Sequence, residues 1–268
     1  MTLEKKLKEL GLTEQEAIDT LRQLSRPQKK VNYHKHHFHP KHIKLGIISD
    51  THIGSKYFNY QAFEDSIQMF NREKVDAIYH AGDVIEGMSN RDGHIYELEV
   101  AGTSGQIDLA VKLLSQYKQP LFFTTGNHDE WAKNKSNQGI LVGPDIEERI
   151  KGSTFLGEYT ANVELAPNVV MRLTHEGSNS YALSYSLQKR VNALEGGSKP
   201  QIIANGHIHK MIYMWYRNIH CFEAGTLLNQ TPFMSMKGSP AHVGYWVLDL
   251  EFDKTGLKGI KQTARPFY

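Results

Sequence analysis

Five short apolar segments of this chain are each followed immediately by residue types that bind metal ions. The residues that follow them are Asp50-Thr51-His52, Gly82-Asp83, Gly126-Asn127-His128-Asp129, His175 and Gly206-His207-Ile208-His209. In open α/β sheets, ligands bind beyond the carboxyl ends of the strands, which is where such residues would meet. The sequence therefore has to fold in a way that brings these five strand ends together.

Strand and helix patterns alternate after residue 43. They predict strands at Lys44–Ser49, Asp76–Ala81 and Pro120–Thr125, with a helix over Gln61–Lys74, a long loop from Asp83 to about Gly102, and a second helix that ends at Tyr117. The second half is richer in strands, at Val169–Thr174, Gln201–Asn205, Met211–Tyr216, Val243–Phe252 and Gly259–Ala264, with one helix over Tyr181–Leu194. This order predicts an α/β fold in which two sheets pack face to face with helices outside.

The residues at the strand ends suit a pair of divalent ions held by mixed nitrogen and oxygen ligands. A carboxylate such as Asp83 can bridge two ions, and Asn127 can offer a neutral oxygen. We expect Gly82, Gly126 and Gly206 to supply the turns that let the ligands converge. Two ions about 3.5–4 Å apart would activate water and neutralise charge on a phosphoryl group, so the pattern predicts metal-assisted phosphoester chemistry.

Three regions are expected along the chain. Residues 1–25 are predicted to form two short amphipathic helices, either a hairpin that docks a partner or, as the favoured interpretation, an arm packed on the main body. Residues 26–43 are rich in His and Lys and are predicted to be a solvated linker, in preference to a metal-capturing segment. The main domain is expected over residues 44–268.

Composition excludes several classes of protein. Hydrophobic residues make up 40% and charged residues 22% of 268 residues, which is typical of a folded globular chain. No apolar run approaches the roughly 20 residues of a membrane helix. The net charge of +2 is far below that of proteins that coat nucleic acid, and the single cysteine, Cys221, excludes an intrachain disulfide. We therefore expect a cytoplasmic protein.

The five motifs in this order resemble the pattern of the calcineurin-like metallophosphoesterase superfamily. The resemblance covers roughly residues 44–250 and implies a four-layer α/β/β/α sandwich. It implies one ion bound by Asp50, His52, Asp83 and His209, and a second bound by Asp83, Asn127, His175 and His207. It also implies that His128 is a catalytic histidine that binds no metal and orients the phosphate or protonates the leaving oxygen.

Within that superfamily, the sequence resembles the branch that acts on DNA. The segments Ile48–Phe58, Tyr216-Arg217, Ala224–Thr226 and Asn229–Phe233 are similar to the exonuclease small subunit of archaeal family D DNA polymerase and, more distantly, to DNA-repair exonucleases. The arginine and leading glycine of the protein phosphatases are absent beside Asp50 and Asp83, which argues against protein dephosphorylation. Residues 1–43 differ from the N-terminal region of the polymerase subunit, which favours a stand-alone relative.

The leading functional hypothesis is a metal-dependent phosphodiesterase that hydrolyses nucleic acid, in particular a 3′–5′ exonuclease. Manganese is the expected metal, with zinc, iron and nickel as alternatives. Four loop residues are candidate substrate contacts: Lys56, Arg91, Trp131 and Lys133. The alternatives are hydrolysis of a small phosphoester, such as a cyclic nucleotide or a monoester, and a non-catalytic scaffold subunit.

Overall fold

The computed structural model describes residues 32–36, 41–133, 139–177, 182–194 and 199–267. Contacts between residues divide the chain into residues 1–31 and residues 32–268, and all of the described residues belong to the second unit. The helical hairpin predicted for residues 1–25 lies outside the described residues.

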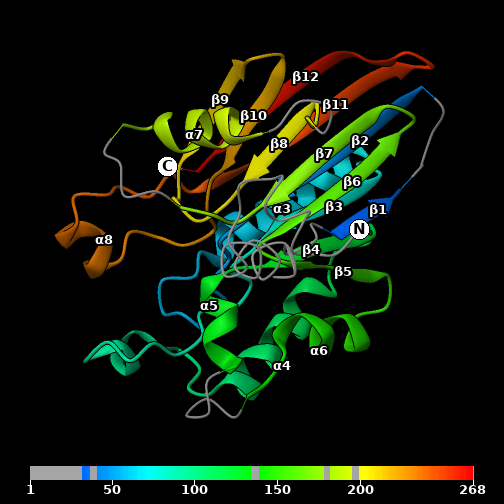
Figure 1. Ribbon diagram of the computed structural model, residues 1–268. Helices are drawn as coiled ribbons and strands as arrows, with labels where there is room; N and C mark the ends of the chain where they lie inside the picture. Colours follow the sequence, from blue (N-terminus) through cyan, green and yellow to red (C-terminus); the bar gives the residue numbers. More distant parts are fainter. Residues whose placement is uncertain (1–31, 37–40, 134–138, 178–181, 195–198, 268) are drawn as a thin grey trace, which may run out of the picture. The chain divides into compact units, whose positions relative to one another are not determined.

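The strands of the described chain form two six-stranded sheets (Figure 1). The first sheet has the order β1 (Asn32–Lys35), β6 (Thr160–Ala166), β7 (Val169–Thr174), β8 (Ile202–Asn205), β10 (Ile219–Ala224) and β9 (Met211–Tyr216). The second sheet has the order β12 (Gly256–Pro266), β11 (Gly244–Asp253), β2 (His42–Ile48), β3 (Ala77–Ala81), β4 (Leu121–Thr125) and β5 (Ser153–Glu158). Parallel and antiparallel pairs occur in both, so both sheets are mixed.

Six α-helices and two short 3-10 helices connect the strands of the described chain. The α-helices are α3 (Tyr60–Glu73), α4 (Thr103–Leu114), α5 (Asn127–Glu130), α6 (Val142–Arg149), α7 (Tyr185–Ala193) and α8 (Pro232–Met236). The 3-10 helices are η1 (His94–Glu97) and η2 (Trp131–Lys133).

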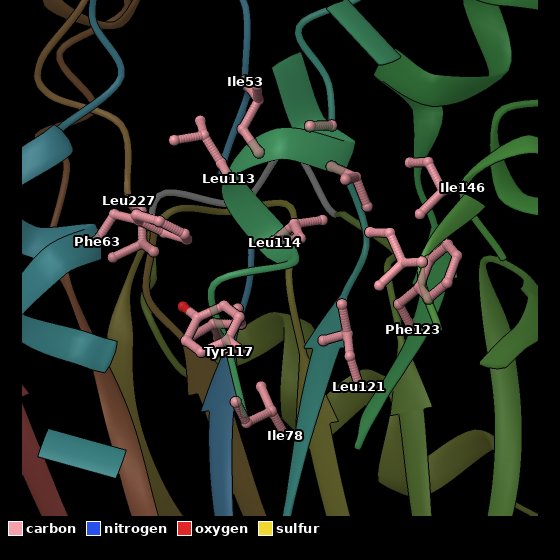
Figure 2. Packing of buried hydrophobic residues seen from close by; sticks show 14 of the residues in the cluster. Ile53, Phe63, Ile78, Leu113, Leu114, Tyr117, Leu121, Phe123, Ile146 and Leu227 are labelled. Carbon is pink, nitrogen blue, oxygen red and sulfur yellow. The ribbon is translucent and has the colours of Figure 1, made fainter. Parts of the chain in front are cut away.

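Three clusters of buried apolar side chains define the layers. One joins α3, α4 and α6 to the outer face of the second sheet, and Figure 2 shows its packing around Tyr117, Leu121 and Phe123. Another fills the space between the two sheets, and the third packs Leu187 and Val191 of α7 on the outer face of the first sheet. The predicted four-layer α/β/β/α sandwich is confirmed.

Alternation along β2 shows how the sequence produces these layers. Ile43, Leu45 and Ile47 face the cluster between the sheets, whereas Ile48 faces the cluster under the helices. This period of two is what a strand buried on both faces requires. At Gly46, an added Cβ would lie 2.7 Å from the ring of Phe70, so glycine lets α3 pack closely on the strand.

The topology places the five motifs at one edge of the sandwich. In the second sheet, β2 pairs in parallel with β3, and β3 pairs in parallel with β4. In the first sheet, β7 pairs in parallel with β8. Since parallel neighbours end at the same edge, the loops after these strands lie side by side within each sheet. The loops of the two sheets also meet, because His52 contacts His209 and Asp83 contacts His175.

The structure differs from the sequence prediction at the start of the main domain. Residues 32–35 were expected in a linker but form β1, which pairs in parallel with β6 at the edge of the first sheet. Residues 42 and 43 belong to β2. Three of the four residues of β1 are exposed, so this edge strand has no buried apolar pattern by which the sequence could reveal it.

The sequence prediction also missed several elements between and after the motifs. These are α5, α6, β5, β6 and β10. One of them carried a usable signal, because Ala161, Val163 and Leu165 alternate with more polar residues along β6 and are fully buried.

Candidate metal centre

Asp50, His52 and His209 bring their ligand atoms together at the edge of the sandwich. His209 Nε2 lies 3.1 Å from Asp50 Oδ1 and 3.1 Å from His52 Nε2. His52 Nε2 is in turn 3.8 Å from both Asp50 Oδ1 and Asp83 Oδ2. Donor atoms that share one ion at bond lengths of about 2.0–2.2 Å are separated by similar distances.

A second group of ligand atoms is built from Asp83, Asn127, His175 and His207. His175 Nε2 lies 3.0 Å from Asp83 Oδ2, and His207 Nδ1 lies 2.8 Å from Asn127 Oδ1. One ligand atom from each of Asp83, His175 and His207 falls within 4.8 Å of the others. The two groups meet at Asp83, whose Oδ2 faces His52 on one side and His175 on the other.

The backbone at the predicted ligands is strained. Five of the seven have positive φ angles: Asp50 (49°), His52 (48°), Asp83 (53°), His207 (80°) and His209 (53°). This left-handed region costs energy for residues other than glycine, and such residues concentrate at functional sites. These backbone conformations place the side chains of Asp50, His52 and His209 in one group of ligand atoms and those of Asp83 and His207 in the other.

Glycines at the strand ends allow the ligands to approach the backbone. Gly82 has φ of 92°, and an added Cβ would lie 2.5 Å from His175 Nδ1. Gly126 has φ of −117°, an ordinary extended value, but a Cβ there would lie 2.3 Å from Asp83 Oδ1. The turn predicted at Gly82 is present, whereas Gly126 is needed for close packing and not for an unusual turn.

The hydrogen bonding of His175 shows that the donor atoms of the site suit a cation. His175 Nδ1 donates a hydrogen bond to the carbonyl oxygen of Ala81 at 2.6 Å, so Nε2 is the nitrogen that would offer its lone pair to a cation that displaces its proton. That buried Nε2 has no hydrogen-bond partner among the described residues, and it lies opposite the carboxylate of Asp83. A carbonyl that fixes the ring in this tautomer is the usual arrangement behind a metal-binding histidine. The residues therefore fit divalent ions.

Opposite charges dominate the titration of these residues. Burial by itself lowers the pKa of His175, but the carboxylates of Asp83 and Asp50 raise it to about 9. Burial by itself raises the pKa of Asp50, but the neighbouring His209 and His175 hold it well below its usual range. The site thus stabilises positive charge beside ionised carboxylates, which is what a site for divalent cations requires.

Glu86 supports several histidines of the centre, which the sequence analysis did not predict. Its Oε2 lies 3.0 Å from His52 Nδ1, and its Oε1 accepts a hydrogen bond from His94 Nε2 at 2.8 Å. The side chain is 7% exposed, and its pKa is held far below its usual range because the surrounding histidines outweigh the effect of burial. A carboxylate on the outer nitrogen of His52 orients that ring and leaves Nε2 for a metal.

Replacement of Glu86 by glutamine is expected to weaken metal binding about 10–100-fold at the ion that His52 binds, because the ring loses its carboxylate partner. A calorimetric titration with Mn²⁺ measures the change. Glu99→Gln is the matched control, since Glu99 accepts a hydrogen bond from the exposed Tyr60 hydroxyl and contacts none of the predicted ligands in the described structure. Equal affinities of Glu86→Gln and the unaltered protein would show that Glu86 does not orient His52.

His128 lies beside the ligands and, like His175, donates from Nδ1 to a backbone carbonyl, but it differs from His52 and His175 in its exposure to solvent. Its Nδ1 donates to the carbonyl oxygen of Glu86 at 2.7 Å, and its backbone N–H donates to Asp83 Oδ1 at 2.8 Å. The side chain is 20% exposed, against 2% for His52 and 0% for His175. Its ring therefore leaves Nε2 available to a molecule that enters from solvent. His128, His52 and Asp83 also have ligand atoms within 4.8 Å of one another.

The structure places the four candidate substrate contacts in different surroundings. The ring of Trp131 packs on that of His128, with 4.0 Å between ring centroids. Arg91 forms two hydrogen bonds of 2.9 Å with Glu97 and lies over the ring of Phe233. Lys56 donates to the carbonyl oxygen of Tyr96 at 2.7 Å, and Lys133 is paired with both Glu130 and Glu158. Two carboxylates on Lys133 leave little positive charge for a phosphate.

The fold, and the groups of Asp and His side chains at its strand ends that could hold metal ions, are those of a metallophosphoesterase. The family model of calcineurin-like phosphoesterases matches residues 43–211, and the chain belongs to this family. The match spans β2 to the start of β9 and so contains all of the predicted ligands.

Several curated relatives are named DNA polymerase II small subunit. The relative from Pyrococcus furiosus is 24% identical over 233 residues, which are 71% of this chain and 38% of that protein. The relative from Methanothermobacter thermautotrophicus is 23% identical over 241 residues, 72% of this chain and 49% of that protein. The chain therefore spans less than half the length of these relatives.

Among solved structures, a novel archaeal phosphodiesterase aligns with a TM-score of 0.49 and 15% identity, over 83% of this chain and all of that one. A search of the described residues for helices long and apolar enough to cross a membrane finds none.

Proposed function

We propose that the protein is a two-metal-dependent phosphodiesterase that hydrolyses nucleic acid, in particular as a 3′–5′ exonuclease. The observation that carries the proposal is that the seven predicted ligands gather at one edge of the sandwich, with His128 beside His52 and Asp83 and more exposed to solvent than either. A non-catalytic scaffold needs neither these residues nor the strained backbone that positions them, so their presence together favours a catalytic protein.

Each of the two proposed ions is assigned to a group of neighbouring ligand residues. Asp50, His52 and His209 would hold one ion, Asn127, His175 and His207 the other, and Asp83 would contact both. When bound, such a pair activates a water molecule and neutralises charge on the phosphate. The metal is proposed to be manganese, because mixed imidazole, carboxylate and amide ligands suit it, and zinc, iron and nickel fit the same donors.

The side chains prepare the site for an in-line displacement at phosphorus. Glu86 holds His128 through its carbonyl oxygen, so that the ring can present Nε2 to a phosphate oxygen or to the leaving oxygen. Trp131 packs against the same ring and limits its rotation. His128 is thus the proposed group that orients the phosphate or protonates the leaving oxygen.

Two observations support nucleic acid as the substrate. The relatives named as subunits of a DNA polymerase match most of this chain. Lys56 lies on the loop that follows His52, and Arg91 and Tyr96 lie on the loop that follows Glu86. Tyr96 is 78% exposed. These side chains are proposed to contact phosphates and a base. A protein partner bound through residues 1–25 stays a prediction.

The protein with Mn²⁺ is expected to hydrolyse bis-p-nitrophenyl phosphate faster than p-nitrophenyl phosphate and to shorten labelled single-stranded DNA. The physical reason is that a diester matches the one negative charge per phosphate of a nucleic-acid strand. Parallel assays with three substrates measure this, and DNA labelled at either end gives the direction of digestion. Preference for the monoester, with no digestion of any oligonucleotide, would favour the alternative of a small phosphoester.

A further inference from the structure

Asn205 connects the two loops that carry His175 and His207. Its Oδ1 accepts a hydrogen bond from the backbone N–H of Glu176 at 3.3 Å, and its Nδ2 donates to the carbonyl oxygen of Gly206 at 2.8 Å. Glu176 directly follows His175, and Gly206 directly precedes His207. One fully buried amide at the end of β8 therefore contacts the neighbours of both histidines.

Glu223 binds the same amide. It lies opposite Asn205 in the parallel pair of β8 and β10, and its Oε2 accepts a second hydrogen bond from Asn205 Nδ2 at 2.6 Å. The backbone N–H of Glu176 can only donate and the carbonyl oxygen of Gly206 can only accept, so the amide oxygen faces Glu176 and the amide nitrogen faces Gly206 and Glu223. Glu223 adds a second acceptor for Nδ2 and so strengthens the hold on the amide that bridges the two loops.

Loss of the hydrogen bond between Asn205 and Glu223 would cost free energy, because Glu223 is buried among few polar partners. The side chain is 0% exposed, and Oε1 has no hydrogen-bond partner among the described residues. Burial raises the pKa of Glu223 to about 8, against the opposing effects of the Asn205 hydrogen bond and the nearby charge of Arg190. A buried carboxyl group with so few partners is rare unless the contact that it makes serves the site.

We propose that Asn205 and Glu223 are a positioning pair that sets the separation of His175 and His207 and thereby controls binding of the ion assigned to Asp83, Asn127, His175 and His207. The proposal rests on the metal centre assigned under the proposed function. The other ion shares Asp83 and takes its remaining ligands from Asp50, His52 and His209, whose side chains form no hydrogen bond with this pair in the described structure. The backbone N–H of His207 does donate to Asp50, so we expect a large effect on the first of these ions and a smaller effect on the other.

The experiment uses Mn²⁺ alone as the probe. Asn205→Asp places two carboxylates face to face and is expected to weaken the second Mn²⁺ at least 10-fold in calorimetry, within the 10–100-fold typical of groups that orient ligands. The electron paramagnetic resonance spectrum is expected to change from that of a coupled Mn²⁺ pair to that of an isolated ion. Asn205→Asp combined with Glu223→Gln restores one amide and one carboxylate, and is expected to recover much of the lost affinity.

A matched control is available in the same sheet. Asn162 on β6 accepts a hydrogen bond from Arg172 Nε at 2.9 Å, and Asn162→Asp is expected to leave both ions bound. Asn205→Ser removes the amide without adding charge and replaces Asn205→Asp if thermal unfolding shows that the latter does not fold. It is expected to weaken the same ion with a smaller fold-change.

Three outcomes would overturn the inference: unchanged affinity for the second ion, equal loss of both ions, or no recovery in the double variant. Binding of fewer than two ions by the unaltered protein would overturn it together with the assigned metal centre. Two bound ions with no hydrolysis of any substrate would overturn the proposed function, while selective loss of the second ion in Asn205→Asp would still support the inference.

Discussion

His128→Ala is expected to reduce turnover of a phosphodiester on the order of 10²–10⁴-fold while both metal ions stay bound, since general acid–base assistance contributes an effect of that size. The ring makes its Nδ1 hydrogen bond to the backbone of Glu86 and is not required to hold Asp83, because the backbone N–H of residue 128 makes that contact. Metal content by elemental analysis and steady-state kinetics together measure the effect.

A comparison of two leaving groups distinguishes between the two roles proposed for His128. If the histidine protonates the leaving oxygen, the defect of His128→Ala should shrink with p-nitrophenolate, which leaves without a proton. A defect that is equal for both leaving groups would indicate orientation of the phosphate instead. His207→Ala is the matched control, because it should lower metal occupancy, with partial rescue by excess Mn²⁺. Loss of a metal in His128→Ala but not in His207→Ala would show that the two assignments are wrong.

Asp83→Asn is expected to abolish binding of both ions at micromolar Mn²⁺, and hydrolysis with it. The carboxylate lies between His52 and His175, so that both ions would lose a charged ligand at once. Loss of a group that only orients a ligand already costs 10–100-fold in affinity, and loss of a shared ligand should exceed that. Elemental analysis after dialysis against Mn²⁺ measures the ions bound per chain.

Asp108→Asn is the control for Asp83→Asn. Asp108 lies on α4 and pairs with Arg149 on the surface, so its neutralisation is expected to leave both ions bound. Asparagine at position 83 can still accept the hydrogen bond from the backbone of His128, and the fold is therefore expected to persist. Retention of two ions by Asp83→Asn would contradict the assignment of Asp83 as a shared ligand.

Much of the ligand set could be predicted from the sequence because it is local. Asp50 and His52 are two residues apart, as are His207 and His209, and each pair directly follows a strand whose apolar residues are easy to recognise. The layers follow from the same residues, since runs such as those of β3 and β4 are buried along their whole length. Parallel strands of this kind need helices on one face and another apolar layer on the other.

Other features could not be predicted because they depend on contacts between distant parts of the chain. The role of Glu86 depends on His52 and His94, which the fold places on either side of its carboxylate. Lys133 looked like a candidate phosphate contact until Glu158, from the strand missed by the sequence prediction, was found beside it. The apolar signal of β5 is weak because only Leu156 and Gly157 of its six residues are buried, and that of β10 is interrupted by His220 and Glu223.

The sequence by itself determined which residue types stand at the ends of the strands, and hence the family and its metal chemistry. The tertiary structure decided which of those atoms face each other. His52 and His209 are 157 residues apart in the chain, yet their Nε2 atoms lie 3.1 Å apart because two sheets pack together and end at one edge. Local spacing encodes a motif, whereas the distance between two motifs is set by packing, which no single segment of the sequence contains.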